Sequence, residues 1–343
     1  MIEATWELIV VIIGIALVFD FTNGFHDSAN SISTVVSTKV LSPRNAVVFA
    51  AFFNFVAAFG FGVAVASTIS KIIHLDVVAT AVVPYIILSA LIGAISWNLI
   101  TWFFGLPTSS SHALIGGLAG AGISAAGFAA IKWSTVEIVV AFMILSPIIG
   151  LACGFLFMAI VLWLTRRANK KSAEQSFKNL QMVSAAANCF SHGTNDAQKT
   201  IGIITPLLFS IGYFGAAADP NNLPIPFWVI ILAYTAIALG TLSGGWRIVK
   251  TMGYNIMKMR PVHGFAANAA SASTIIGASI AGIPVSTTHI ICTSIMGVGS
   301  TMGSSAVKWG VARTIMWAWI MTIPISAIIG FATFAVVRVI IGY

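Results

Sequence analysis

The sequence predicts an all-α integral membrane protein that crosses the bilayer several times. Hydrophobic residues make up 58% of the 343 residues and charged residues only 8%, which leaves too little polar surface to cover a soluble globule of this size. Val77–Ile131 and Pro261–Val307 contain no Asp, Glu, Lys or Arg, and each could supply about two crossings of roughly 20 residues. In addition, two short motifs occur once in each half of the chain. We therefore expect a polytopic protein built from two related halves.

The first half divides into five apolar segments. In chain order they are Trp6–Gly24, Ala46–Ser67, Ala79–Phe104, Ser109–Ala126 and Thr135–Thr165. The first segment is expected to be a retained helix rather than a signal peptide, because its start lacks a basic region and the apolar run continues into Asp20 instead of a cleavage site. The fourth segment follows Pro107, and the sequence leaves open whether it crosses the membrane or turns back as a re-entrant helix.

Basic residues mark the junction of the halves. Of the 17 Lys and Arg residues, five lie in Arg166–Lys178 and four in Arg247–Arg260. Basic loops that border membrane helices face the cytoplasm. We therefore expect a first transmembrane repeat at residues 1–165, a short basic cytoplasmic linker at residues 166–179 and a second repeat at residues 180–343. The net charge of +8 then reflects membrane topology, and no nucleic-acid partner is expected.

The second half also divides into five segments. They are Leu180–Tyr213, Phe227–Arg247, Val262–Ile283, Ser286–Met302 and Val311–Ile341. An odd number of crossings in each half inverts the second half relative to the first, and inverted repeats are common among secondary transporters. The sequence therefore predicts inverted-topology repeats with broken or re-entrant helices at the duplicated motifs. Both termini are expected outside the plasma membrane.

One duplicated motif combines a Gly-x-Pro turn with a run of hydroxyl residues. Gly105–His112 reads Gly-Leu-Pro-Thr-Ser-Ser-Ser-His, and Gly282–His289 reads Gly-Ile-Pro-Val-Ser-Thr-Thr-His. Proline favours a helix start, where unpaired backbone N–H groups and nearby hydroxyls can hold an anion. A single copy would more simply cap a helix or bond two helices, but the duplication favours a binding site. The predicted anion-binding hydroxyls are those of Thr108, Ser109, Ser110, Ser111, Ser286, Thr287 and Thr288. The two histidines are expected to close the caps by hydrogen bonding rather than to relay protons.

The other duplicated motif carries an aspartate. Asn23–Asn30 aligns with His192–Lys199, which matches Asp27 with Asp196. A charged carboxylate at membrane depth costs about 3 kcal/mol on insertion scales, so two at equivalent positions indicate a function. The flanking Gly, Ser, Thr and Asn residues weaken a helix and predict a local break whose carbonyl groups can bind a cation. The predicted cation-binding residues are Asp27, Asn30, Asn195 and Asp196. Lys199 is expected to neutralise the anion or to pair with an aspartate, and an ion pair with Asp27 is the structural alternative.

These paired motifs and the central basic linker resemble the inorganic phosphate transporter (PiT) family of secondary carriers over essentially the whole chain. The resemblance implies a secondary active transporter that imports inorganic phosphate by cation symport with alternating access. His26, where eukaryotic members usually carry Asn, and Gln198-Lys199 at the end of the second motif resemble bacterial members. Na⁺ is the favoured coupling ion because the motifs are rich in oxygen ligands, and H⁺ is the alternative. The expected partners are phosphate, the coupling ion and the lipid bilayer, without a cofactor or any metal beyond Na⁺. Metal-complexed phosphate and a homo-oligomer are left open.

Three other functions share parts of this pattern. Carboxylate acceptors favour hydrogen phosphate, which keeps a P–OH donor, but a sulfate or other oxyanion carrier remains if the aspartates bind only cations. An anion channel would share the hydroxyl-lined helix starts. A membrane enzyme acting on phosphorylated lipids is disfavoured because no carboxylate lies close in sequence to orient either histidine. Import of a dianion against a negative-inside potential costs roughly 2.3 kcal/mol per charge per 100 mV, so accumulation requires symport with cations.

Overall fold

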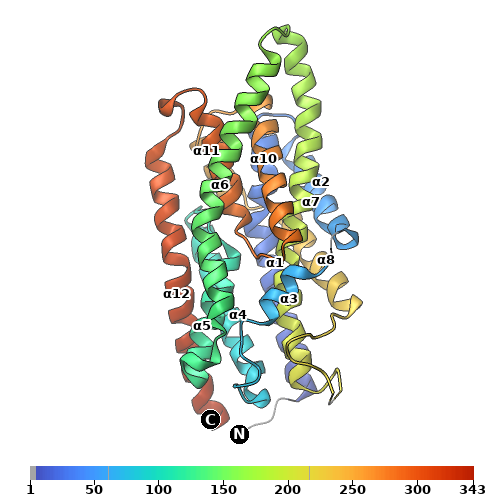
Figure 1. Ribbon diagram of the computed structural model, residues 1–343, viewed down its shortest axis with the longest axis vertical. Helices are drawn as coiled ribbons and strands as arrows, with labels where there is room; N and C mark the ends of the chain where they lie inside the picture. Colours follow the sequence, from blue (N-terminus) through green and yellow to red (C-terminus); the bar gives the residue numbers. More distant parts are fainter. Residues whose placement is uncertain (1–4, 61, 216) are drawn as a thin grey trace.

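The computed structural model describes residues 5–60, 62–215 and 217–343. These residues form an elongated bundle whose long helices follow its long axis (Figure 1). Within the described ranges the β-structure amounts to one isolated bridge between Ile73 and Ile131. The predicted all-α fold is therefore confirmed.

Each half supplies six α-helices. Those of the first half are α1 (Trp6–Ser37), α2 (Pro43–Val56), α3 (Ala64–Ser70), α4 (Val83–Phe103), α5 (Ser110–Ala126) and α6 (Trp133–Thr165). Those of the second half are α7 (Lys170–Ser210), α8 (Phe227–Ser243), α9 (Trp246–Lys250), α10 (Pro261–Ile280), α11 (Thr287–Ser300) and α12 (Trp309–Ile341). Short 3₁₀ turns lie at Ala57–Phe59, Thr80–Val82, Phe128–Ala130 and Ser304–Ala306, and a π-helical turn at Thr251–Asn255 follows α9.

Several of these helices are long and apolar enough to cross a membrane. Within the described residues four helical stretches qualify alone, namely α1, α4 with its preceding turn, α6 and α12. Two bent pairs, α2 with α3 and α8 with α9, bring the number to as many as six. If each bent pair is counted as one unit, each apolar segment expected from the sequence matches one helix or one bent pair of helices. The chain is thus built as a multi-pass membrane protein.

The aspartate motifs do not break their helices, which corrects the expectation from the sequence. Both motifs lie inside continuous helices, since α1 and α7 are helical throughout. Their glycines serve packing instead. A β-carbon at Gly24 would overlap the backbone of Ile237 in α8, and one at Gly193 would collide with the backbone of Asn54 in α2. Tertiary packing therefore overrides the weak helix propensity of Gly, Ser and Asn.

The Gly-x-Pro motifs do interrupt the helices. The chain leaves α4 through Gly105 (φ 66°) and leaves α10 through Gly282 (φ 69°), in the left-handed region that favours glycine. In Figure 1 the α4–α5 hairpin lies in the lower half of the bundle, and the α10–α11 hairpin lies in the upper half. The starts of α5 and α11 meet between them, where Ser111 Oγ donates to Val285 O at 3.2 Å.

The two halves exchange packing partners. α5 packs against α12 and α11 against α6, while α1 packs against α8 and α2 against α7. Gly120 and Gly297, at equivalent positions, permit two of these contacts, because a β-carbon there would overlap the backbone of Ala327 or Leu151. The start of α1 and the end of α12 lie at one end of the bundle, and the α6–α7 connection lies at the other (Figure 1). Most of the expected basic linker is helical, since α7 begins at Lys170.

Candidate functional site

The two motif aspartates meet in the interior of the bundle. Asp27 of α1 and Asp196 of α7 are 2% and 0% exposed. One ligand atom from each of Asp27, His192 and Asp196 lies within 4.8 Å of the other two. A single cation at this point can therefore contact both halves of the protein.

Each helix start places one hydroxyl beside the aspartate of its own half. Ser110 Oγ donates to Asn23 Oδ1 at 2.6 Å and to Asp27 Oδ2 at 3.4 Å. Its repeat equivalent, Thr287, donates through Oγ1 to Asp196 Oδ2 at 3.4 Å. The predicted anion-binding and cation-binding groups are therefore adjacent in both halves.

Asn30 and Asn195, the two predicted amide ligands of the cation, donate hydrogen bonds through their nitrogens. Asn30 Nδ2 donates across the two halves to Thr288 Oγ1 at 2.9 Å and to Thr287 Oγ1 at 3.4 Å. Asn195 Nδ2 donates to Ser279 Oγ at 3.0 Å. The amide oxygens of Asn30 and Asn195 are buried and have no hydrogen-bond partner among the described residues. Buried amide oxygens that are not hydrogen-bonded can bind a hard cation.

Lys199 pairs with the aspartate of its own helix. Its Nζ lies 2.8 Å from Asp196 Oδ1, and His192 Nε2 lies 3.3 Å from Asp196 Oδ2. In the first half, His26 Nδ1 contacts Asp27 Oδ1 at 2.6 Å. The ion pair between Asp27 and Lys199 considered from the sequence is therefore not the one formed, because the ion pair of Lys199 is with Asp196 of its own helix.

The remaining predicted hydroxyls have structural partners. Ser109 and Ser286 are the N-caps of α5 and α11, and each accepts a hydrogen bond from the backbone N–H three residues ahead, at 3.3 Å and 3.2 Å. Thr108 Oγ1 donates to Thr101 Oγ1 at 2.9 Å, and Ser111 joins the two hairpins. Four of the seven predicted hydroxyls therefore hold the hairpins in position, while those of Ser110, Thr287 and Thr288 contact the aspartates or Asn30.

The two motif histidines, which lie in the first turns of α5 and α11, contact each other. The rings of His112 and His289 contact each other at a centroid distance of 4.9 Å, and His289 stacks on Trp319 at 3.9 Å. The caps are closed by the backbone N–H groups of these histidines, not by their rings. The expectation that the histidines close the caps holds for their main chain only.

This architecture recurs in known proteins. A family model described as the phosphate transporter family matches residues 23–174 and 164–330. The chain belongs to the phosphate transporter family. The sequence resemblance is thereby confirmed, and so is the prediction of a transporter rather than an enzyme.

Relatives within this phosphate transporter family match almost end to end. The chain is 50% identical to a "Probable low-affinity inorganic phosphate transporter" of Rhizobium meliloti (strain 1021), with 94% of this chain and 95% of that protein aligned. It is 46% identical to a protein with the same description from Bacillus subtilis (strain 168), with 97% and 98% aligned. Among solved structures, "The sodium-dependent phosphate transporter" superposes with a TM-score of 0.87 at 25% identity, covering 97% of this chain and 100% of that one.

Several buried polar groups at or near the site of this transporter were not predicted from the sequence. Asn23, His26 and His192 contact the predicted site residues directly, and Asn188 Nδ2 donates to the backbone carbonyl of Asn30 at 3.0 Å. A fully buried aspartate, Asp20, lies on the same α1 face as Asn23 and Asp27. The spacing of three and then four residues along α1 was the signal that could have found this face.

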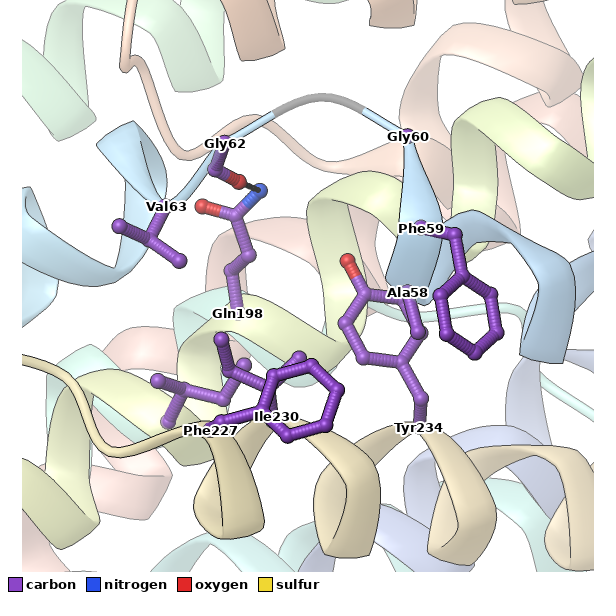
Figure 2. Close-up of a pocket in the computed structure, with 10 residues that line it drawn as sticks. Ala58, Phe59, Gly60, Gly62, Val63, Gln198, Phe227, Ile230 and Tyr234 are labelled. Atoms are coloured by element: carbon purple, nitrogen blue, oxygen red, sulfur yellow. Dashed lines mark hydrogen bonds between the residues drawn. The ribbon is translucent and has the colours of Figure 1, made fainter.

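Gln198, which precedes Lys199, has a structural role in this family member. Its Oε1 accepts from the backbone N–H groups of Val65 at 2.9 Å and Ala66 at 3.1 Å, at the start of α3. Its Nε2 donates to Gly62 O at 3.0 Å. Figure 2 shows this amide reaching Gly62 beside the ring of Tyr234, at a cavity of about 250 Å³ between α7, α8 and the end of α2. Gln198 therefore anchors the bent α2–α3 pair to the helix that carries Asp196 and Lys199.

Proposed function

We propose that this chain is a secondary active transporter that imports inorganic phosphate by cation symport with alternating access. One observation carries the proposal: two hydroxyl-bearing helix starts, one from each half, converge on a buried pair of aspartates. The descriptions of the relatives and of the solved neighbour support phosphate as the anion.

The anion is proposed to bind between the starts of α5 and α11. Each helix N-terminus carries about half a positive charge, and its free N–H groups can donate to an oxyanion. The hydroxyls of Ser110, Thr287 and Thr288 add side-chain donors. Thr108, Ser109, Ser111 and Ser286 would act indirectly by holding the helix starts in place. Lys199 adds a fixed positive charge beside the site.

The cation is proposed to bind between Asp27 and Asp196, with the amide oxygens of Asn30 and Asn195. Four oxygen ligands in a buried position suit Na⁺, and the solved neighbour is described as sodium-dependent. The carboxylates could instead carry protons, which is the alternative form of coupling. Cations at this position would offset the negative charge of phosphate next to the aspartates.

The two halves are proposed to be inverted repeats in a bacterial plasma membrane. The exchanged packing of α5 with α12 and of α11 with α6 supports this proposal, as does the placement of the two hairpins in opposite halves of the bundle (Figure 1). Re-entrant hairpins that enter from opposite sides would give the shared site access to either face in turn.

The test is radiolabelled phosphate uptake into proteoliposomes, with Na⁺ and pH gradients imposed separately. We expect saturable uptake that follows one of the two gradients and is absent from liposomes without protein. Flux that does not saturate and ignores both gradients would identify a channel. Competition by sulfate as effective as that by unlabelled phosphate would identify a general oxyanion carrier.

A further inference from the structure

A third buried carboxylate lies outside the proposed site. Asp20 of α1 is 0% exposed, and neither of its oxygens has a hydrogen-bond partner among the described residues. It lies about two helical turns before Asp27 on the same face of α1. A buried charge without a partner is costly, particularly in a membrane protein, so this carboxylate requires a functional explanation.

The groups around Asp20 are mainly hydrogen-bond donors. The Thr200 hydroxyl and the Asn23 amide lie beside it, and Lys199 of α7 contributes a positive charge. Asn23 Oδ1 already accepts from Ser110, so its amide nitrogen is the part left free. Divalent and other hard metal ions need several oxygen ligands, whereas of these neighbours only the Thr200 hydroxyl offers an oxygen that is not already hydrogen-bonded. The surroundings therefore suit a carboxyl group that gains and loses a proton, not a metal ion.

Other titratable groups near Asp20 come from two helices. α7 contributes Asp196 in addition to Lys199, and α8 contributes Tyr234. α4 carries no Asp, Glu, Lys, Arg or His, while Arg44 of α2 is exposed.

α9, α10 and α11 pack against the part of α1 that follows Asp20, and these helices contribute no charge at Asp20. Arg247 and Lys250 of α9 are exposed. His263 of α10 accepts from the backbone N–H of Arg260, and His289 of α11 stacks on Trp319.

Buried carboxylates outnumber buried lysines among the described residues, so a proton at Asp20 reduces the excess of negative charge. They comprise three carboxylates, Asp20, Asp27 and Asp196, and one lysine. Lys199 is in contact with Asp196, and Asp27 is in contact with His26. Asp20 has no such contact, although the Lys199 ammonium lies close enough to interact with it. Asp20 is therefore the buried carboxyl that can exchange a proton without breaking an existing contact with a basic side chain.

The repeat also differs at the position that Lys199 occupies. Its equivalent in the first half, Asn30, has a buried amide oxygen without a hydrogen-bond partner among the described residues, whereas the Lys199 ammonium contacts Asp196. At this position the second half has the positively charged side chain of Lys199, and the first half has the amide oxygen of Asn30.

We propose that Asp20 is a proton-binding site of the transport cycle and that Lys199 is its charge partner. One proton binds a carboxyl oxygen of Asp20 and later leaves the same oxygen toward the other side of the membrane. Lys199 stays on Asp196 while Asp20 is protonated, and it is shared by both carboxylates once the proton has left. This inference rests on the proton-coupled form of the proposed function and assigns a residue to that coupling.

The test compares Asp20→Asn with the unchanged protein in proteoliposomes without Na⁺ and with an alkaline interior. Two quantities are measured, namely phosphate accumulation and the exchange of labelled for unlabelled phosphate, which needs no net proton movement. We expect the variant to lose accumulation above the external concentration and to keep exchange. Asp219→Asn, the same change in the exposed α7–α8 connection, should leave both unchanged.

Three results would overturn the assignment. The first is accumulation that persists in Asp20→Asn. The second is loss of exchange together with accumulation in a folded variant, since Asp20 would then belong to the binding site. The third is accumulation by the unchanged protein with a Na⁺ gradient alone. Asp20→Ser serves as a second neutral variant if the Asn variant does not reconstitute, and restored accumulation in Asp20→Glu would support the proposal. Absence of exchange in the unchanged protein both without Na⁺ and with Na⁺ on both sides of the membrane would instead refute the proposed function.

Discussion

Equivalent residues of the two halves share some roles and not others. Ser110 and Thr287 each donate to the aspartate of their own half. Asn30 and Lys199 occupy equivalent positions, yet one donates to the opposite helix start and the other forms an ion pair. The residue-level asymmetry lies in the charged groups, so the halves should contribute unequally to cation coupling and similarly to anion binding.

Neutralising either motif aspartate should abolish concentrative phosphate uptake. Asp27→Asn and Asp196→Asn remove carboxylates that are buried next to the hydroxyls of the helix starts. Gradient-driven uptake in proteoliposomes measures the loss, and size-exclusion profiles check folding. Asp76→Asn, which changes a half-exposed aspartate, is the matched control. Near-normal accumulation in either motif variant would show that its carboxylate is structural.

The hydroxyls that face the aspartates should differ in effect from those that cap the helices. Ser110→Ala and Thr287→Ala should each weaken phosphate binding by roughly 1 to 3 kcal/mol, the scale of a hydrogen bond to a charged group. Ser109→Ala and Ser286→Ala should instead lower stability by about 0.5 to 2 kcal/mol, because they remove N-caps. The phosphate concentration at half-maximal uptake and the melting temperature separate the two effects. A change confined to the first half would refute a site shared by the repeats.

At the scale of the helices, the hairpins depend on close backbone contact with a long helix of the other half. Gly120 and Gly297 occupy equivalent positions on α5 and α11, where added side-chain atoms would meet the backbone of α12 or α6. Small residues at such contacts are characteristic of membrane helix pairs, because dispersion contacts and backbone proximity replace the hydrophobic effect. The position of each hairpin, and hence of its hydroxyls, is therefore set by the opposite half.

Alanine at Gly120 should destabilise the protein, whereas alanine at Gly277 should not. The first change forces overpacking against Ala327, which typically costs about 1 to 3 kcal/mol. Gly277 of α10 has open space around it, so alanine there should be neutral or stabilising by up to about 1 kcal/mol. Thermal unfolding in detergent measures both. Equal melting temperatures for the two variants would contradict the packing argument.

At the scale of the whole molecule, the start of α1 and the end of α12 lie at the opposite end of the bundle from the α6–α7 connection (Figure 1). The connection carries Arg166 and Arg167, and basic loops favour the cytoplasmic side. This arrangement agrees with an odd number of crossings in each half, which the proposed inverted repeats require.

Accessibility labelling should place the two ends of the bundle on opposite sides of the membrane. A protease site inserted after Arg167 should be cleaved only from the cytoplasmic side, and a tag after Tyr343 should be reached only from outside. Intact cells and inside-out vesicles provide the two directions of access. Cleavage and tag binding from the same side would rule out the inverted arrangement.

The sequence by itself determined the membrane class and the family, and it predicted a two-part organisation and a set of central residues. Composition is a sum over residues, and a carboxylate or hydroxyl has the same chemistry wherever it lies, so the duplicated motifs pointed to Asp27, Asp196, Ser110 and Thr287 without a structure. The breaks at Gly105 and Gly282 were also readable, because the turn chemistry of glycine and proline is local.

Only the tertiary structure decided which helices remain continuous and which side chains meet. α1 and α7 pass through their motifs unbroken because Gly24 and Gly193 pack against other helices, an interaction that local propensity does not contain. The division of hydroxyls into caps and site groups, the pairing of Lys199 with Asp196, and the position of Asp20 follow from the register of helices far apart in the chain. Periodicity assigns residues to a face of one helix, but packing decides what that face meets.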